Sequence, residues 1–212
     1  GEMDNGWNVT VNMEVENNAQ QASGNNMDSR SVVIDMNDMG SLTFAGHGGS
    51  TAAAAIDDKT PSAYGESWDV IGSTAARTGG STSKVGAIGG FGDDKIWTYT
   101  APDTIEGFNI VLSYVPSHTD RPESSTSMRV EYTGVDGLAV GYATDSNGKT
   151  GTTAATEEIE SELAYVTYAY DSFTVGYQYN EADGATTDND DEMTAYGVTY
   201  AVSDDLSIGY NY

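Results

Sequence analysis

Carboxylate groups are the main source of chemistry in this sequence, and one long stretch gathers several of them. The stretch 48–94 shows no strand periodicity and contains three bases, Lys59, Arg77 and Lys84. Its acids are Asp57, Asp58, Glu66, Asp69, Asp93 and Asp94. A ring of acidic side chains favours cations, whereas the same acids on a solvated loop would do no chemistry. The residues alone leave both interpretations open.

Two shorter acidic groups have the clustered oxygens that calcium prefers. Neither the group at 35–38 nor the group at 188–191 matches the twelve-residue loop of an EF-hand. The first is better explained as a tight turn, in which Asn and Asp side chains supply local hydrogen bonds. The second group is the stronger of these two weak calcium candidates, with Asp188, Asp190 and Asp191 as its ligands.

Catalysis finds no support in the sequence. The only histidines, His47 and His118, lie beside or in loops, and no GxSxG, HExxH or nucleotide-binding glycine motif occurs. The chain has no cysteine, which excludes a thiol nucleophile, a disulfide framework and a cysteine-ligated zinc site. Its 33 acids against 8 bases give a net charge of -25, so no basic surface could neutralise nucleic-acid phosphates. We therefore expect no enzyme, no cofactor beyond the weak calcium candidate, and no nucleic-acid partner.

The elements that must position these residues are β-strands. Apolar and polar residues alternate along most of the chain, as in Trp7, Val9, Val11, Met13 and Val15. A sustained period of two indicates strands with one apolar and one polar face. Eleven strands are predicted, at 6–16, 29–36, 41–47, 95–101, 108–116, 127–134, 138–145, 161–170, 173–181, 192–202 and 206–212.

The connections between these strands alternate strictly between long and short. Five are tight, at 37–40, 102–107, 135–137, 171–172 and 203–205, and five are long, at 17–28, 48–94, 117–126, 146–160 and 182–191. Up-and-down strands with short turns at one end and long loops at the other are typical of outer-membrane barrels. A Greek-key sandwich would mix the lengths irregularly. The pattern predicts an all-β, antiparallel transmembrane barrel, although a soluble β-sandwich stays as the alternative.

The two faces of the predicted strands differ in the way that a barrel wall requires. Aromatic residues flank the tight turns, which predicts an interfacial girdle formed by Tyr99, Tyr168, Tyr170 and Phe173. The opposite face of the 161–181 hairpin carries Thr167, Ala169, Thr174, Gly176 and Gln178, which we expect to face water inside the barrel. Tyr165 falls on this inner face, and the pattern does not explain it.

The number of strands is odd. With eleven strands both edge strands run in the same direction, whereas bacterial single-chain barrels have even numbers. We therefore predict that residues 1–212 form part of one longer barrel domain, with further strands before and after them.

Several motifs together resemble the Gram-negative general porins, closest in appearance to those of marine alphaproteobacteria. The motifs are GEMDNGWNVTV at the start, SVVIDMNDMGSLTFAG at 31–46, DDKTPSAYGESWD at 57–69, VEYTGVDGLAVGYA at 130–143 and MTAYGVTYAVSDDLSIGYNY at 193–212. The resemblance implies a sixteen-stranded barrel, usually a homotrimer, whose third external loop folds into the lumen. The loop 48–94 follows the third predicted strand instead of the fifth, so two strands would be missing in front and three behind.

The resemblance also implies roles for the charged residues. General porins set acids of the constriction loop against basic residues of the wall. Here the acids would be Asp57, Asp58, Glu66 and Asp69. Arg129 is the only base well inside a strand on a polar face and is our first candidate for the wall, with Lys95 second.

The function implied is an outer-membrane channel in the lipid bilayer of a Gram-negative bacterium. It would pass small hydrophilic solutes and ions down their gradients and prefer cations. Two alternatives stay open: a secreted acidic β-sandwich or adhesin-like module that depends on calcium, and a barrel that anchors without an open pore.

Overall fold

The computed structural model describes residues 1–15, 27–63, 92–118, 122–148, 158–184 and 191–212. No helix among these residues is long and apolar enough to cross a membrane. The described part of the chain consists almost entirely of β-strands with two short 3-10 helices.

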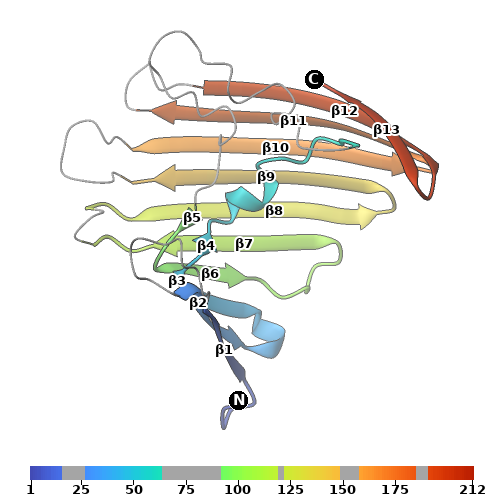
Figure 1. Cartoon of the computed structure of the whole chain (residues 1–212). Coiled ribbons are helices and arrows are strands. Elements are labelled where there is room, and N and C mark those ends of the chain that lie inside the picture. Colours follow the sequence, from blue (N-terminus) through green and yellow to red (C-terminus); the bar gives the residue numbers. More distant parts are fainter. Residues whose placement is uncertain (16–26, 64–91, 119–121, 149–157, 185–190) are drawn as a thin grey trace.

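Eleven strands form one antiparallel sheet in which every strand pairs with its neighbours in the sequence (Figure 1). The strands are β1 (Asn8–Val15), β2 (Met27–Asp35), β3 (Ser41–His47), β6 (Ile96–Thr100), β7 (Phe108–Val115), β8 (Ser125–Val135), β9 (Leu138–Asn147), β10 (Ile159–Tyr170), β11 (Phe173–Gly184), β12 (Asp191–Ser203) and β13 (Leu206–Asn211). All eleven predicted strands are confirmed, with ends that agree to within three residues. The all-β, up-and-down prediction is therefore correct.

Four short elements lie in segments that were predicted to be loops or turns. The 3-10 helix η1 (Asn37–Met39) fills the tight turn between β2 and β3. Inside 48–94, β4 (Gly49–Ser50) pairs with β5 (Gly92–Asp93), and η2 (Ala53–Ile56) follows β4. Elements of two to four residues are too short to show a period in the sequence, so pattern analysis could not find them.

The tight turns rely on residues with positive φ. Gly137 (φ 75°) lies in the β8–β9 turn, and Asp171 (φ 52°) lies in the two-residue turn between β10 and β11. Two-residue hairpins need such backbone angles, which glycine adopts freely and aspartate tolerates. The register that follows is regular, and in β10–β11 it pairs Tyr170 with Phe173 and Ile159 with Gly184.

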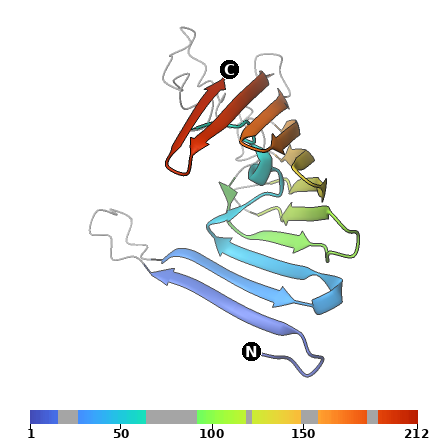
Figure 2. The same cartoon turned by 90° about the vertical axis from the view of Figure 1, so that its right-hand side faces the viewer.

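The sheet is strongly curved (Figure 2). Its convex face, opposite η2, exposes large apolar side chains. On β10 and β11 these include Val166 (39% exposed), Val175 and Tyr177 (both 46%). A sandwich would bury this face against a second sheet. Among the described residues the only other sheet is the two-stranded β4–β5 pair. The sandwich alternative is therefore not favoured.

The concave face carries the packed part of the molecule. The segment 51–63, which we call the strap, lies against this face, and η2 is its helical part (Figure 2). Ala53 and Ile56 of η2 pack with Ala143, Leu163 and Tyr165 of the sheet in one buried cluster. This cluster lies between the strap and the inner face of β9 and β10, and a second, smaller one is formed by Ala45, Ile96 and Val115 of β3, β6 and β7.

Candidate functional site

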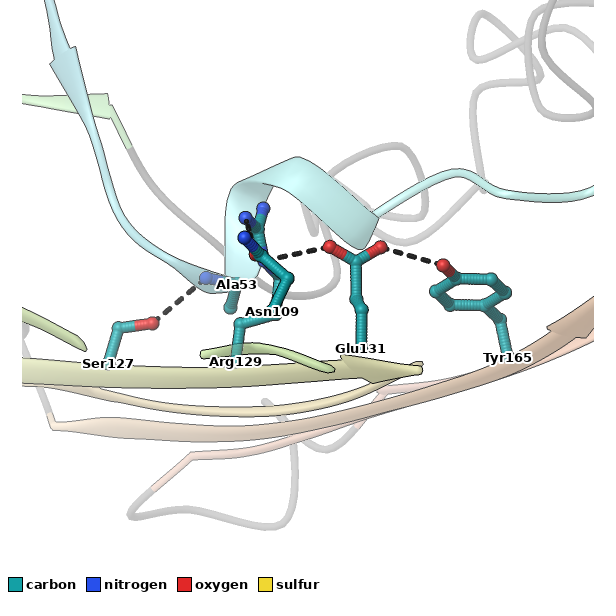
Figure 3. Close-up of polar contacts among 6 residues, drawn as sticks. All are labelled: Ala53, Asn109, Ser127, Arg129, Glu131 and Tyr165. Atoms are coloured by element: carbon teal, nitrogen blue, oxygen red, sulfur yellow. Dashed lines mark hydrogen bonds and ion pairs between the residues drawn. The ribbon is translucent and has the colours of Figure 1, made fainter. Parts of the chain in front are cut away.

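The candidate site is the inner face of β8 to β13 together with the strap that crosses it. Because side chains alternate between faces along a strand, Ser127, Arg129 and Glu131 of β8 all point to the side on which η2 lies (Figure 3). Asn109 of β7 and Tyr165 of β10 point to the same side (Figure 3). The inner face is therefore a polar surface facing a loop segment, with no second layer of secondary structure among the described residues.

The first end of the strap is bonded to β8 and β9. The backbone N–H of Ala53, at the start of η2, donates to Ser127 Oγ at 3.0 Å. The first residues of a helix have N–H groups without partners in the helix, so a wall hydroxyl satisfies one of them here. Two residues earlier, Thr51 Oγ1 donates to Asp145 Oδ2 at 3.4 Å, and both residues are buried.

The other end of η2 is held by two side-chain amides of β11. Gln178 Nε2 donates to the backbone oxygens of Ile56 (2.9 Å) and Asp57 (2.8 Å), and Asn180 Nδ2 donates to the same Asp57 oxygen (2.9 Å). Gln178 Oε1 accepts the backbone N–H of Lys59 at 2.5 Å. Carbonyls at the end of a helix lack hydrogen-bond donors within the helix, and here the side-chain amides of the wall are the donors. Gln178 and Asn180 are 0% and 1% exposed.

Beyond η2 the strap runs over three glycines of the inner face. A Cβ atom on Gly176 or Gly197 would collide with Pro61, and one on Gly209 would lie 3.0 Å from the Ala63 Cβ. Gly176 and Gly197 are direct partners in the β11–β12 register. The absence of side chains at these positions lets the backbone of the strap approach the wall closely. We call Gly176, Gly197 and Gly209 the glycine track.

Arg129 forms a partly buried network instead of standing alone on the wall. Its Nε lies 3.1 Å from Glu131 Oε2 as an ion pair, and its NH2 group donates to Asn109 Oδ1 at 3.0 Å. The Arg129 and Glu131 side chains are 14% and 18% exposed. The sequence predicted the position of Arg129 on the polar face, but it did not reveal that a neighbouring carboxylate neutralises its charge.

The same network explains the unassigned inner-face tyrosine. The Tyr165 hydroxyl donates to Glu131 Oε1 at 2.7 Å, and its ring is only 6% exposed because it packs against η2 (Figure 3). Its partner in the β9 register is Gly141, where a Cβ would collide with the ring. Tyr165 therefore belongs to the contact between strap and wall.

Asp57 and Asp58 follow η2 directly in the strap. The Asp58 carboxylate accepts the backbone N–H of Thr60 at 3.1 Å. Burial raises the pKa of the Asp57 carboxyl, although backbone N–H groups and the nearby Lys59 charge act in the opposite direction. Of the other predicted constriction acids, Glu66 and Asp69 lie outside the described residues.

The second basic candidate, Lys95, is exposed and lies between β5 and β6 with a positive φ of 64°. Close to it in sequence, Asp94 Oδ1 lies 2.6 Å from His47 Nδ1, and both side chains are more than a third exposed. The structure places this pair and Lys95 at the end of the sheet where the segment 48–94 leaves and returns.

The predicted aromatic residues lie on the convex face, near the tight turns. Tyr168, Tyr170 and Phe173 are 43%, 71% and 51% exposed, and the Phe173 ring contacts Tyr200 with centroids 4.5 Å apart. The Tyr99 hydroxyl donates to the backbone oxygen of Met39 in η1 at 2.9 Å. Their role as a membrane girdle stays a prediction.

The calcium candidates fall at the limit of what the structure describes. Asp188 and Asp190 lie outside the described residues, and Asp191 is the first residue of β12. Within the described ranges no three His, Asp or Glu side chains are grouped so that they could hold a metal ion. Calcium binding at 188–191 stays a prediction.

Sequence reasoning missed the residues that hold the strap. Gln178 was expected to face water on the inner face, and it does lie on that face, but the strap covers it completely. Gly176 was likewise assigned to the lumen without a role. The one signal available was that polar and glycine residues recur at every second position of β11. This pattern shows that they share one face of the strand, but it does not show what that face contacts.

Comparison with known proteins places this geometry among outer-membrane proteins. A sequence profile of Gram-negative porins matches residues 1–212. No curated protein matches the chain significantly.

Two solved structures share the fold. A loop L8 deletion mutant of OmpT, an outer membrane protein of Vibrio cholerae, is 18% identical with a TM-score of 0.56; the match covers 87% of this chain and 61% of that one. An anion-selective porin from Comamonas acidovorans is 13% identical with a TM-score of 0.58, covering 90% and 58% respectively. The chain thus spans about three fifths of the length of these structures.

Proposed function

The chain belongs to the Gram-negative porin family, and on this premise we propose that it forms the wall and constriction of a water-filled channel for small hydrophilic solutes. The protein lies in the outer membrane, with lipid bilayer as its surroundings. Family membership supports a channel and not an enzyme. Solutes would pass by diffusion, selected mainly by size.

The observation that carries this proposal is the inverted distribution of polarity across one curved sheet. The convex face exposes apolar and aromatic side chains, which suits hydrocarbon. The concave face is polar and holds a segment from between β3 and β6 as a lining. The strap is the described beginning of 48–94, and its position against the concave face supports our proposal that the whole of 48–94 forms the constriction.

We further propose that the channel prefers cations. The net charge is -25 and the strap contributes Asp57 and Asp58, while the charge of Arg129 is offset by Glu131. These two carboxylates outnumber the one base of the strap, Lys59, and an excess of acidic groups at a constriction favours cations. One of the similar structures is described as anion-selective, but at 13% identity it supports only the shared fold.

The wall in this chain is proposed to be part of a larger barrel that assembles as a homotrimer. The edge strands β1 and β13 run in the same direction in an eleven-stranded antiparallel sheet, so joining them would need a parallel seam. The similarity to porins of marine alphaproteobacteria also stays a prediction, since the profile match is to Gram-negative porins in general.

The test is electrical recording on the purified full-length protein that contains this chain, inserted in a planar bilayer. We expect stepwise conductance, and in a salt gradient a reversal potential of the sign that cation flow produces. Absence of conductance steps would reject the channel and would favour a barrel that anchors without an open pore. A reversal potential of the opposite sign would reject cation preference while leaving the channel intact.

A further inference from the structure

The strap is fastened to the wall mainly through one residue, Gln178. It makes hydrogen bonds to three backbone groups of the strap, the oxygens of Ile56 and Asp57 and the N–H of Lys59, at 2.5 to 2.9 Å. Its Nε2 also lies 2.9 Å from Asn180 Oδ1, and Asn180 in turn donates to Asp57. Both side chains are inaccessible to water.

We infer that Gln178 is the positioning residue of the constriction: its carboxamide, supported by Asn180, fixes the strap against the wall and thereby sets the width of the channel. This inference rests on the proposed function, because it assigns to the strap a place inside the conducting path. It goes further by naming the bonds that hold the strap at its place within that path.

The chemistry favours an amide at this position. The strap presents two acceptors and one donor close together, and a carboxamide carries both donors and an acceptor without charge. A carboxylate would place its oxygens against the carbonyls of Ile56 and Asp57. An aliphatic side chain would leave the Ile56 oxygen and the Lys59 N–H without these bonds, and the Asp57 oxygen with Asn180 alone. The contact therefore discriminates sharply between side chains of the same size.

The glycine track fixes the path of the strap beyond this contact. Pro61 rests on Gly176 and Gly197, and Ala63 lies beside Gly209. With the amide bonds at one end and close backbone approach at the other, the strap crosses β11, β12 and β13 along a single line. The hydrogen bonds and the steric fit are separate observations, and both place the strap against the inner face of the wall.

The first experiment records single channels of Gln178→Leu and Gln178→Glu in the full-length protein. Losing these bonds shifts the equilibrium between attached and detached strap by a factor of about 5 to 30. Gln178→Leu should therefore show altered conductance with increased open-channel noise and a changed solute size limit. Tyr177→Phe is the matched control, because Tyr177 is the adjacent residue of β11 on the convex face and is 46% exposed.

The Glu variant supplies a reversible readout that a loss of barrel folding would not give. At low pH its protonated carboxyl can donate one hydrogen bond and accept another, which partly restores the wild-type pattern. Gln178→Glu should thus behave like wild type in acid and like Gln178→Leu at neutral pH. A pH profile of Gln178→Glu that parallels wild type would overturn the inference, as would wild-type conductance and noise in Gln178→Leu.

A cross-link tests the position of the strap without any current. The chain has no cysteine, so Ala63→Cys with Gly209→Cys introduces the only pair. The Cβ separation of 3.0 Å is half an ångström below the usual range of about 3.5–4.5 Å for a disulfide. We expect oxidation to close this bond rapidly. In the control pair, Ala63→Cys with Ser207→Cys, the second cysteine is displaced by two residues, about 7 Å along β13, and should react slowly.

The two assays separate the two claims. If the wild type does not conduct but the Ala63→Cys/Gly209→Cys pair closes, and closes more slowly when Gln178→Leu is added, the proposed function fails and the positioning role stands. If the wild type conducts while the pair reacts no faster than its control, the inference fails and the channel stands.

Discussion

The two faces of strand β11 show how one sequence serves two solvents. Gln178 and Asn180 on the concave face are buried, whereas Val175 and Tyr177 on the convex face are each 46% exposed. In a water-soluble protein the apolar residues would be the buried ones. Here the polar pair is buried because each amide has backbone partners in the strap. Polar side chains can thus be buried on the inner face because they are hydrogen-bonded, and apolar side chains can be exposed on the outer face because lipid surrounds it.

The largest expected effect comes from placing the same charge on either face. Val166 lies on the convex face of β10, midway between Glu162 and Tyr170, and Val166→Arg should destabilise the folded barrel by about 2–4 kcal/mol. Thr167→Arg, one residue on and on the concave face, should cost far less. Folding titrations in lipid vesicles measure both. Equal losses of stability in the two variants would contradict the assignment of faces.

The next effect tests the charge balance on the inner face. Arg129→Gln leaves the Glu131 carboxylate, which is 18% exposed, without its cation, and should destabilise by about 1–3 kcal/mol while raising cation preference. Glu131→Gln should shift the reversal potential the other way, and the double variant should restore both quantities toward wild type. Additive effects in this double-mutant cycle would show that the two residues do not interact.

A smaller effect is expected from the convex aromatic contacts. Phe173 and Tyr200 have ring centroids 4.5 Å apart, and such pairs contribute about 0.5–1.5 kcal/mol beyond their buried area. The coupling energy from Phe173→Leu, Tyr200→Leu and the double variant should fall in this range, with ion selectivity unchanged. A shift in reversal potential would place these rings near the conducting path.

The smallest effect is the pH dependence of the strap. Because burial raises the pKa of Asp57, its folded state binds a proton more readily than its unfolded state. The contribution of Asp57 to the stability of the folded state is therefore complete below pH 3.8, the ordinary pKa of the group. It declines as the pH rises through the raised pKa of the folded state. Asp57→Asn should flatten this decline, measured as protease resistance of the strap against pH. An unchanged pH profile would show that Asp57 does not contribute.

Local alternation was enough to predict the wall. The parity of Val166 and Thr167, the tight turn at Asp171 and the strict alternation of long and short connections follow from neighbours in the chain. The position of Arg129 on the polar face could be predicted in the same way. Glu131 is only two residues from Arg129 on the same face of the same strand. The ion pair between them could still not be predicted, because alternation gives the face of a side chain and not the direction in which its charged end points.

The strands and their faces could be predicted because a period of two is a local property that every hairpin of the wall repeats, and five motifs were enough to indicate the family. How the wall and the strap meet could be seen only in the folded structure. Gln178 and Asp57 are separated by more than a hundred residues, and nothing local marks them as partners. Tyr165 is explained only once η2 lies above it. Contacts of this kind depend on where the chain returns in space, which is decided when the sheet curves and the strap is laid along its concave face.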